Sequence, residues 1–479
     1  MQRDSLLTSG KHDKLRNRLN GKYRDHEIGS VSCLGHCHSG TALMIDRSIH
    51  HLENTDNNEV VIKPGPGPEP DFHTGTNAEN PVLIGEIRDL AEYYGVLKNY
   101  SGDIMAALKE IELSGLRGRG GAGFPVHIKL RTSAEAVSEK KYVVGNADEG
   151  DPGAFSDKWL LEKRPHSILF GMLATGLIIG ADTGIIYVRG EYPEAVKAIG
   201  LAIKEFENQK ELFAGFAGKD FNFSFQVIEG AGAYICGEET SLLNSIEGLR
   251  PEVRSRPPFP AVYGLFGKPT ILCNVETFSC IWNILREGGA AYSLIGTAKS
   301  KGTKLVSLDG GFNKPGIYEV SMGTPLREII NDMGGGTRLP VKAYQVGGPL
   351  GGIVPSSAVN SLSLDFESFS TSGFLLGHAG IVSIPADYSM MKFLLHLFEF
   401  VSKESCGKCF PCRIGSQRGY ELLEDALQNG GKINKTLFDD LLETMQLGSL
   451  CALGGGVSLP VMNIMKYFSV ELESFFINE

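Results

Sequence analysis

The chain has 479 residues, which is too long for a single ordinary core and predicts about two to four domains. Its composition, 42% hydrophobic and 21% charged, is typical of a soluble globular protein and excludes a largely disordered or membrane-embedded one. The formal net charge of -10 argues against nucleic acid as a partner, because nucleic-acid binding needs a positive field.

No segment has the pattern of a secretion signal or a membrane span. The N-terminal residues MQRDSLLTSGKHDKLRNR lack an apolar core, and the longest apolar stretch, around residues 168–181, is shorter than the ~20 residues that cross a bilayer. Nine cysteines without a secretion signal favour a reducing compartment and metal or thiol chemistry over disulfides. We therefore expect a cytoplasmic protein without direct membrane insertion.

The sequence divides into four regions, which predict an α/β multidomain fold. Residues 1–80 form a poorly patterned extension ending in KPGPGPEPD, a linker whose alternating Pro and Gly hold neither helix nor strand. Residues 81–295 alternate helical patterns with short β-rich runs, as in a layered α/β domain. Residues 296–388 carry short strands and one helix, TPLREIINDMGG, which indicates a small α+β domain. The apolar spacing of residues 389–479 predicts a helical bundle.

A glycine-rich segment, GLRGRGGAGFP (115–125), follows a helical pattern in the α/β region. Its exposed backbone N–H groups and the guanidinium groups of Arg117 and Arg119 would suit a phosphate. It lacks the strand-then-GxGxxG placement of the usual dinucleotide fingerprint. A flexible surface loop therefore stays open as an alternative.

Two acidic motifs follow the glycine-rich segment. GNADEGDPGAF (145–155) places Asp148, Glu149 and Asp151 after a β-rich run, where they could accept hydrogen bonds from sugar hydroxyls or merely solvate a turn. GAYICGEETSLLNSIEG (232–248) places Glu238 and Glu239 at a helix start, where a favourable helix dipole is explanation enough. Neither a Ser/His/Asp set nor an HExxH motif appears, so hydrolytic chemistry has no support.

Four cysteines of the bundle have the spacing of a cluster site. SCGKCFPC places Cys406, Cys409 and Cys412 in two overlapping CxxC steps, and Pro411 is expected to keep this segment a loop rather than a plain helix. Cys451 follows two helical patterns that could form a hairpin and return it to this loop. Four thiolates fit a 4Fe4S cluster, and a structural zinc is the alternative. Cys236, Cys273 and Cys280 show no ligand spacing and are expected to be small buried hydrophobes.

Five motifs in series resemble the NADH-oxidising flavoprotein subunit of respiratory complex I. They are GLRGRGGAGFP, NADEGDPGAF, GAYICGEET, RPPFPAVYGLFGKPTILCNVET and ESCGKCFPCRIG…SLCALGG. They are equally similar to the soluble relatives of that subunit in NAD-linked hydrogenases, formate dehydrogenases and electron-bifurcating complexes. The resemblance covers about residues 81–479. It implies a Rossmann-like FMN-binding domain, a ubiquitin-like (β-grasp, soluble-ligand-binding) domain and a helical bundle that carries the 4Fe4S cluster.

The resemblance also implies roles for individual residues. Those at its FMN-binding positions are Gly118, Arg119, Gly120, Gly121, Lys129, Asn146, Asp148, Gly237, Glu238, Glu239 and Asn274. Those at positions lining its nucleotide pocket are Phe124, Asp151, Tyr234 and Phe259. No side chain is implied as catalytic, since flavin N5 is the hydride acceptor.

Some residues depart from the family pattern. Arg256 replaces a common lysine before PPFP, and with Arg254 it could favour the 2′-phosphate of NADP, so both NAD(H) and NADP(H) stay open. Gly150 and Asp151, in DEGDPG rather than the respiratory DESEPG, indicate the hydrogenase and bifurcating branch.

The N-terminal extension carries a further pair, Cys33 and Cys37, in VSCLGHC. This segment resembles the second half of the four-cysteine pattern that binds a 2Fe2S cluster in the thioredoxin-like domain of many relatives. The first half is missing, and a pair alone cannot fill a two-iron cluster. The region is either a degenerate remnant or a variant site that recruits His36, His38 or a ligand from a partner.

The sequence therefore predicts an NAD(P)H dehydrogenase (diaphorase-type) subunit of a soluble complex. The resemblance implies hydride transfer between nucleotide and FMN and single-electron transfer between FMN and the 4Fe4S cluster. The expected partners are other iron-sulfur subunits, including a two-iron thioredoxin-like one. The alternative is a non-catalytic iron-sulfur relay and docking scaffold that has lost nucleotide binding.

Overall fold

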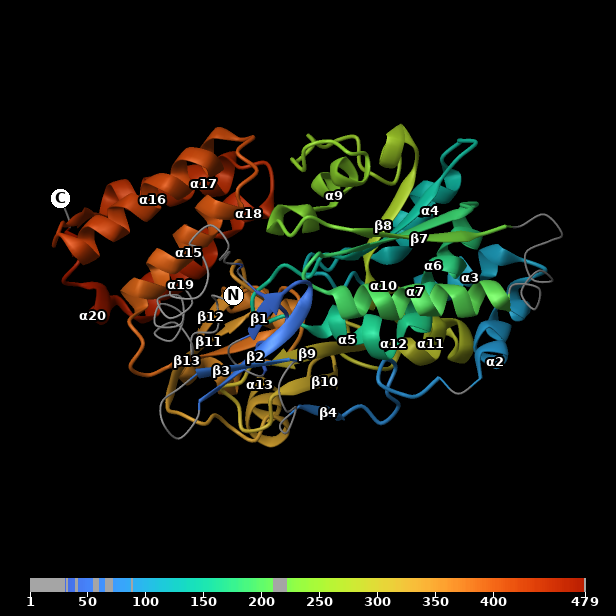
Figure 1. Ribbon diagram of the computed structural model, residues 1–479, viewed down its shortest axis with the longest axis horizontal. Helices are drawn as coiled ribbons and strands as arrows, with labels where there is room; N and C mark the ends of the chain where they lie inside the picture. Colours follow the sequence, from blue (N-terminus) through green and yellow to red (C-terminus); the bar gives the residue numbers. More distant parts are fainter. Residues whose placement is uncertain are drawn as a thin grey trace.

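The structure is a computed structural model that describes residues 31, 33–38, 42–54, 60–64, 72–87, 89–209 and 222–477. The N-terminal sequence considered above for a targeting signal lies outside these residues. In Figure 1 an α/β region lies at the right, a region built on a mixed sheet lies at the lower centre, and a helical bundle lies at the upper left.

The α/β region is built on a four-stranded parallel sheet in the order β7-β6-β5-β8. The strands are β5 (Tyr142–Ala147), β6 (Thr183–Val188), β7 (Ser224–Glu229) and β8 (Thr270–Asn274). The chain runs outward from β5 to β7 and then crosses back to place β8 on the other side of β5. The carboxyl ends of β5 and β8 therefore form a topological switch point, where open parallel sheets place their ligands.

Helices cover both faces of this sheet (Figure 1). Val143 and Ile186 point into a core shared with α6 (Pro165–Ile179) and α7 (Pro193–Asn208), while Val144 and Ile185 point into a core shared with α9 (Glu239–Ile246). This alternation follows from the two-residue period of a strand. The other helices of the region are α2 (Leu90–Gly95), η2 (Val96–Tyr100), α3 (Ile104–Ser114), α4 (Val126–Glu135), α5 (Ser156–Lys163), η3 (Tyr234–Gly237), η4 (Leu265–Gly267), α10 (Val275–Ser279), α11 (Ile281–Glu287) and α12 (Gly289–Ser293).

The second region has a six-stranded mixed sheet in the order β12-β11-β13-β9-β10-β4. Its strands are β4 (His73–Thr76), β9 (Thr303–Leu308), β10 (Gly316–Ser321), β11 (Val341–Val346), β12 (Gly352–Pro355) and β13 (Ile381–Pro385), and its helices are α13 (Leu326–Glu328), η5 (Ile329–Met333), η6 (Ser356–Ser361) and α14 (Phe366–Thr371). Strand β4 comes from the N-terminal extension and pairs in parallel with β10. The extension thus contributes an edge strand to a sheet formed more than 200 residues later in the chain.

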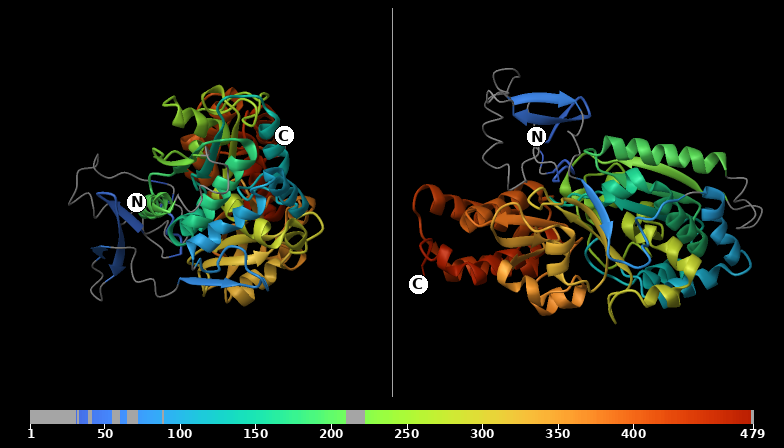
Figure 2. Two further views of the ribbon diagram at one scale, coloured as in Figure 1. Left: turned by 90° about the vertical axis from the view of Figure 1, so that its right-hand side faces the viewer. Right: turned by 90° about the horizontal axis from the view of Figure 1, so that it is seen from below.

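The extension also forms a sheet of its own. Strands β1 (Ala42–Ile45), β2 (Ser48–Asn54) and β3 (Val60–Pro64) pair antiparallel in chain order. Figure 2 shows this small sheet standing out from the body of the molecule. The expectation of a poorly patterned extension missed these strands. Each of the first two pairs with the next strand in the chain, as in a β-meander.

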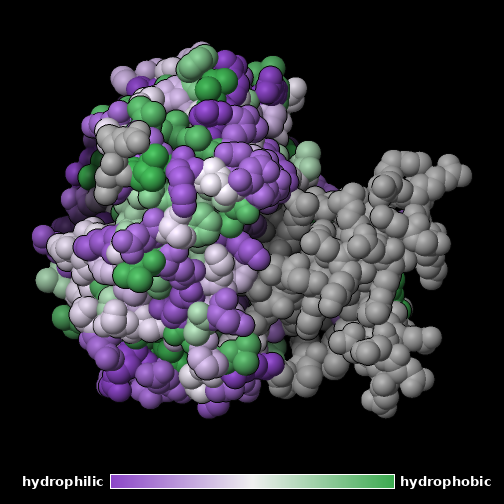
Figure 3. Space-filling model, turned by 90° about the vertical axis from the view of Figure 1, so that its left-hand side faces the viewer, coloured by the Kyte–Doolittle hydropathy of each residue, from purple (hydrophilic) through white to green (hydrophobic). Residues whose placement is uncertain are grey.

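The bundle is formed by α15 (Met390–Glu404), α16 (Phe410–Gln428), α17 (Lys435–Gly448), α18 (Ala452–Gly456), α19 (Ser458–Tyr467) and α20 (Ser469–Leu472), with a short pair of strands, β14 (Ile433–Asn434) and β15 (Phe476–Ile477). Helices α15, α16 and α17 pack against one another around Phe398, Phe438 and Met445. On the end of the molecule that the bundle forms, hydrophobic residues are interspersed with hydrophilic ones (Figure 3).

Helix α6, which contains most of the longest apolar stretch, lies in the core of the α/β region, with nearly every side chain buried. Among the described residues, no helix combines the length and apolar character that crossing a membrane requires. Close packing explains one glycine of α6: a Cβ at Gly171 would lie 2.0 Å from the carbonyl oxygen of Phe278 in α10.

We predict that Gly171→Ala lowers the free energy of unfolding by roughly 1 to 3 kcal/mol, because α6 and α10 must move apart to admit the methyl group. Thermal unfolding followed by circular dichroism measures the change. Gly200→Ala in α7 is the matched control, because its Cβ meets no described atom within 4 Å. That substitution should stabilise the helix by about 0.5 to 1 kcal/mol. Equal midpoints for the two variants would contradict the packing argument.

Candidate functional site

A cavity of about 240 Å³ lies at the switch point, where the three regions meet. The α/β region contributes most of its wall, the mixed-sheet region contributes Leu350 and His378, and the bundle contributes Cys451, Ala452 and Leu453. The residues from the α/β region are Arg119, Gly120, Asn146, Asp148, Glu149, Gly150, Asp151, Ser156, Asp157, Tyr234, Ile235, Gly237, Glu238, Asn274 and Glu276.

Seven of the eleven residues that the resemblance implies for FMN meet in this wall. They are Arg119, Gly120, Asn146, Asp148, Gly237, Glu238 and Asn274. Asn146 and Asn274 are neighbours across the β5–β8 pair, so the parallel register alone brings them to one place. Gly118, Gly121, Lys129 and Glu239 lie outside the wall, and their assignment to FMN stays a prediction.

The two asparagines are held by their own hydrogen bonds. Asn146 Nδ2 donates to the carbonyl oxygen of Gly237 over 2.9 Å, and Asn274 Nδ2 donates to Asp157 Oδ2 over 2.6 Å. Asn274 Oδ1 also accepts the N–H of Glu276 at the start of α10. Both side chains are therefore oriented before any ligand arrives, which lowers the entropy lost on binding.

The two arginines of the glycine-rich segment have different surroundings, and only Arg119 lines the cavity. Arg117 pairs with Glu367 over 2.6 Å and lies over the ring of Phe366. The buried guanidinium of Arg119 donates to Tyr292 Oη over 3.2 Å and to a backbone carbonyl. Arg117 therefore lies outside the cavity wall, whereas Arg119 lines it, and the buried Nε and Nη1 atoms of Arg119 have no hydrogen-bond partner among the described residues. A guanidinium group of Arg119 at a phosphate stays a prediction. Gly120 approaches Asn274 closely, since a Cβ there would lie 3.0 Å from Asn274 Cβ.

Asp148 gives the cavity an unsatisfied acceptor. Its buried Oδ2 has no hydrogen-bond partner among the described residues, although buried oxygens usually have one. Burial raises the pKa of this carboxyl from 3.8 to about 7, against the lowering effect of Arg189 and with the help of Glu191 and Glu404. A ligand with hydroxyl groups, such as the ribityl chain of a flavin, would satisfy this oxygen. The wall therefore fits FMN.

A charged network lies beside the cavity at the start of α9. Glu238 Oε2 accepts the N–H groups of Thr240 and Ser241, so Glu238 caps the helix as well as lining the cavity. Glu239 lies 2.6 Å from Arg256 and 3.4 Å from Lys129. Glu238 thus interacts with the start of the helix, where the sequence placed it, and it does so as the N-cap, while Glu239 has two cationic partners.

The residues implied for the nucleotide divide into two groups. Asp151 and Tyr234 line the cavity, and Tyr234 Oη donates to Asp151 Oδ1 over 2.7 Å. His378 Nε2 lies 3.0 Å from Asp151 Oδ2. Phe124 and Phe259 lie outside the wall with exposed rings, and Arg256 lies with Glu239. The structure therefore places only the first two at the cavity.

The four cysteines of the bundle lie together at the junction of α15, α16 and α18. Cys409 is the N-cap of α16, Cys412 lies in its first turn, and Cys451 is the N-cap of α18 after the α16–α17 hairpin. The hairpin was predicted correctly. The loop expected through Cys412 was not, because Pro411 sits in the first helical turn, where a missing N–H costs nothing.

The donor set fits a cluster. Cys406, Cys409 and Cys451 surround Cys412 closely enough to act on its titration. Burial raises the pKa of the Cys412 and Cys451 thiols to about 11, so the protein alone does not stabilise their thiolates and a bound metal must supply the opposing charge. In the described part of the chain no three His, Cys, Asp or Glu side chains converge on the position of a single ion. Four cysteine thiols are the ligand set of a 4Fe4S cluster.

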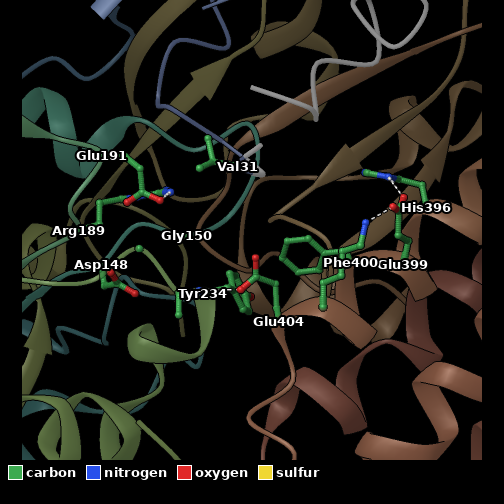
Figure 4. A pocket seen from close by; sticks show the side chains of 13 residues that line it. Val31, Asp148, Gly150, Arg189, Glu191, Tyr234, His396, Glu399, Phe400 and Glu404 are labelled. Carbon is green, nitrogen blue, oxygen red and sulfur yellow. Dashed lines mark hydrogen bonds and ion pairs between the residues drawn. The ribbon is translucent and has the colours of Figure 1, made fainter. Parts of the chain in front are cut away.

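A second cavity of about 190 Å³ shares Asp148, Gly150 and Tyr234 with the first. In Figure 4, Arg189 and Glu191 come from the α/β region, while His396, Glu399, Phe400 and Glu404 project from α15 on the opposite side. Charged side chains dominate this wall, and Arg189 pairs with Glu191 over 3.0 Å. The second cavity thus places Glu191 and Glu404 near Asp148, where they add to the effect of burial in raising its pKa, while Arg189 opposes them.

The Cys33–Cys37 pair lies apart from both cavities' walls. Its two sulfur atoms are 3.3 Å apart, and both side chains are buried. Burial makes the main contribution to lowering the pKa of His36 and His38, so both rings are neutral near pH 7. Cys236, Cys273 and Cys280 are buried too, as expected for small hydrophobes.

Several wall residues were missed by sequence reasoning. Asp157 and Glu276 follow β5 and β8 closely, so the rule that ligands bind at the carboxyl ends of parallel strands could have found them. Leu350 and His378 lie on loops of the mixed-sheet region, and only the packing of two regions brings them to the cavity.

The geometry and the motifs agree with the known families that this chain matches. Residues 111–283 match the Nuo51 FMN-binding domain, residues 305–354 the SLBB domain, and residues 392–475 the NADH-ubiquinone oxidoreductase-F iron-sulfur binding region. The chain belongs to the family of NADH-binding flavoprotein subunits of complex I and related complexes. FMN, a 4Fe4S cluster and NAD(H) are the cofactors of this oxidoreductase family.

The relatives of this chain include subunits of both respiratory and hydrogenase complexes. It is 40% identical to an NADH-quinone oxidoreductase subunit of Rhizobium meliloti (strain 1021), over 78% of this chain and 89% of that protein. It is also 40% identical to the NADP-reducing hydrogenase subunit HndC of Solidesulfovibrio fructosivorans, over 82% of this chain and 81% of that one. A crystal structure of NAD+-reducing [NiFe]-hydrogenase has a similar fold, with a TM-score of 0.81 and 27% identity, over 94% of this chain and 78% of that chain.

The raised pKa of Asp148 predicts a pH dependence of stability. Between pH 3.8 and about 7 the folded, FMN-free protein holds a proton that the unfolded chain has lost, so this residue's contribution to stability falls as pH rises through that interval. Asp148→Asn removes this titration. We expect the unfolding free energy of the variant, minus that of the wild type, to increase up to about pH 7 and then level off. Urea unfolding across this range measures it.

Asp309→Asn is the matched control. Burial raises the pKa of Asp309 to about 7 as well, but Asp309 lies outside the cavity wall and accepts hydrogen bonds from Ser383 and Gly311. Both variants should show the pH trend, and only Asp148→Asn should weaken FMN binding. A stability difference for Asp148→Asn that does not vary with pH would refute the assignment.

Proposed function

We propose that this chain moves a hydride between a pyridine nucleotide and FMN, and single electrons between FMN and a 4Fe4S cluster. It would do so as a diaphorase-type subunit of a hydrogenase, formate dehydrogenase or electron-bifurcating complex. One observation carries the proposal: Cys451, a predicted cluster ligand, lies in the same cavity wall as the predicted flavin-binding residues. When bound, FMN supplies the change from two-electron to one-electron transfer that iron and sulfur alone cannot make.

The protein's part in this chemistry is binding and orientation. Gly120 leaves room for the backbone to approach a ligand closely, and the amides of Asn146 and Asn274 are already oriented. Asp148 Oδ2 can accept a hydrogen bond from a hydroxyl group. On the bundle side, Ala452 and Leu453 close the wall with apolar groups beside Cys451 and reduce the access of water. This arrangement supports direct electron transfer from flavin to cluster.

The residues that depart from the respiratory pattern fit together in space. A Cβ at Gly150 would lie 2.6 Å from the ring of Tyr234, whose hydroxyl donates to Asp151. Glycine at position 150 therefore admits the Tyr234 ring, and aspartate at position 151 receives its hydroxyl. This coupling supports the hydrogenase and bifurcating branch, to which the same two residues pointed in the sequence.

Charge pairing supports NADH rather than NADPH as the nucleotide. Arg256 pairs with Glu239, and Arg254 pairs with Glu247 over 2.6 Å and donates to Asn244 Oδ1 over 2.8 Å. The two guanidinium groups that could favour a 2′-phosphate are thus neutralised within the chain. Glu239 would also repel that phosphate.

We predict that Glu239→Gln raises the affinity for NADPH relative to NADH by roughly ten-fold, because it removes a negative charge and releases Arg256. Equilibrium binding of both nucleotides to the holoprotein measures the ratio. Glu247→Gln, which releases Arg254 instead, is the matched comparison and should change the ratio less. A ratio that Glu239→Gln leaves unaltered would remove Arg256 from the nucleotide site.

The partners proposed for this chain are other iron-sulfur subunits, including a two-iron thioredoxin-like one. Exposed apolar side chains flank the cysteine site on α16, at the end of α17 and on the segment that follows α17, namely Phe410, Ile414, Leu447 and Leu450. Apolar groups beside a cluster provide a dry contact where electrons could leave for a second cluster.

We expect the purified protein to show a flavin absorbance band and to reduce an artificial dye with NADH. Cys451→Ser should abolish the EPR signal of the reduced 4Fe4S cluster while it leaves the flavin band and flavin-dependent dye reduction largely intact, because its side chain replaces one thiolate ligand only. Optical and EPR spectra of the same samples measure both effects.

Cys280→Ser is the control, since Cys280 is buried away from the bundle and should leave the EPR signal unchanged. An unchanged signal in Cys451→Ser would refute the ligand assignment. A wild-type protein with the cluster signal but neither a flavin band nor NADH binding would instead establish the non-catalytic relay and docking scaffold.

A further inference from the structure

The turn formed by residues 33–38 brings two thiols into contact. Cys33 Sγ and Cys37 Sγ lie 3.3 Å apart, and the N–H of Gly35 donates to Cys33 Sγ over 3.2 Å. Gly35 has a left-handed backbone with φ of 70°, and a Cβ there would lie 2.5 Å from the ring of Tyr192. The turn is therefore shaped by close packing against the α/β region.

Two other regions of the chain hold this turn from opposite sides. The guanidinium of Arg189 donates to the carbonyl oxygen of Cys33 over 2.9 Å, and the N–H of Gly310 donates to that of Cys37 over 2.9 Å. Arg189 belongs to the α/β region and Gly310 to the mixed-sheet region. The exposed fractions of Cys33 and Cys37 are 0% and 5%.

A 2Fe2S cluster does not fit this turn. Such a cluster takes four protein ligands, whereas the turn supplies the two thiols of Cys33 and Cys37. The ring of His38 packs against Phe72 and Phe155, with centroids 4.9 and 5.2 Å away.

We propose that Cys33 and Cys37 are a reversible dithiol–disulfide pair that exchanges with a low-molecular-weight thiol–disulfide couple. The sulfur atoms need to approach by only about 1.3 Å to reach the S–S bond length of about 2.05 Å. The S–S bond of the small disulfide breaks and the Cys33–Cys37 bond forms through a mixed disulfide. The pair is oxidised by two electrons, the small disulfide is reduced, and the two thiol protons leave on the two small thiols.

The small size of the ring indicates a regulatory rather than a structural bond. Closing a ring of five residues restricts the unfolded chain far less than closing a long loop, so the bond adds little to stability and is readily reduced. Cys37 carries the only measurable exposure of the two and is the sulfur that meets the small disulfide.

Contacts through Arg189 and Tyr192 connect the Cys33–Cys37 turn to the wall of the flavin cavity. Arg189 donates to the backbone carbonyl of Glu149 as well as to Cys33, and Tyr192, which packs on Gly35, donates to Glu149 Oε2 over 3.1 Å. Glu149 lines the cavity. Drawing the two sulfur atoms together shifts the Cys33 carbonyl against Arg189, and we expect oxidation to weaken FMN binding by roughly five-fold, the low end of typical coupling between sites.

The test equilibrates the holoprotein in glutathione buffers from fully reduced to fully oxidised, followed by acid quench, alkylation and peptide mass spectrometry. We expect a Cys33–Cys37 cross-link that appears and disappears reversibly and is absent from Cys33→Ser and Cys37→Ala. Cys280→Ser should retain it. Iron content should equal one 4Fe4S cluster in wild type and in Cys33→Ser alike. The wild-type protein alone answers the main question if a variant fails to fold.

Three different results would contradict the proposal or the coupling to FMN binding. Thiols that stay open to alkylation in every buffer would overturn the pair, and extra iron that Cys33→Ser removes would overturn it in favour of a second cluster. A reversible cross-link without any change in FMN affinity would overturn the coupling. The coupling rests on the proposed flavin site, whereas the cross-link is read without any flavin signal, so the two can fail separately.

Discussion

A buried ion pair between Lys304 and Glu276 fixes the arrangement on which the cavity depends. Both side chains are 1% exposed, and Glu276 Oε1 also accepts the N–H of Leu305. Two charges buried so deeply are tolerated only when each is paired and hydrogen-bonded, so β9 of the mixed sheet can take one position on α10. Because Asn274 caps α10 and lines the cavity, the same contact sets the distance between two of its walls.

A second buried carboxylate ties the N-terminal part of the chain to this frame. Glu319 accepts three consecutive backbone N–H groups, from Val82, Leu83 and Ile84, and the hydroxyl of Thr303. Such a carboxylate fixes a segment that belongs to no helix or strand. It explains how the extension can leave β4 on the edge of the mixed sheet and still enter the α/β region at residue 81 in a fixed direction.

The sequence predicted the parts of the site that depend on local pattern. The family resemblance implied Asn146 and Asn274, which lie at the carboxyl ends of β5 and β8, and parallel pairing brings them together. The spacing of Cys406, Cys409 and Cys412 predicted that these residues lie close together, and the helical hairpin before Cys451 predicted its return to them. His378 carries no such pattern, and Nη2 of Arg119 donates to Tyr292, a residue distant in sequence. Sequence reasoning missed these contacts because tertiary packing, rather than local sequence pattern, brings their residues together.

The cavity concentrates features that weaken the ligand-free fold. Asp148 keeps an unpartnered buried oxygen, and like-charged Glu191 and Glu404 stand behind it. Elsewhere in this chain buried carboxylates such as Glu276 and Glu319 are fully paired, so the exception is local. An unpartnered acceptor costs about 1 to 3 kcal/mol, which a bound hydroxyl offsets. At the proposed flavin site, cofactor binding and stability would therefore be linked through one carboxyl group.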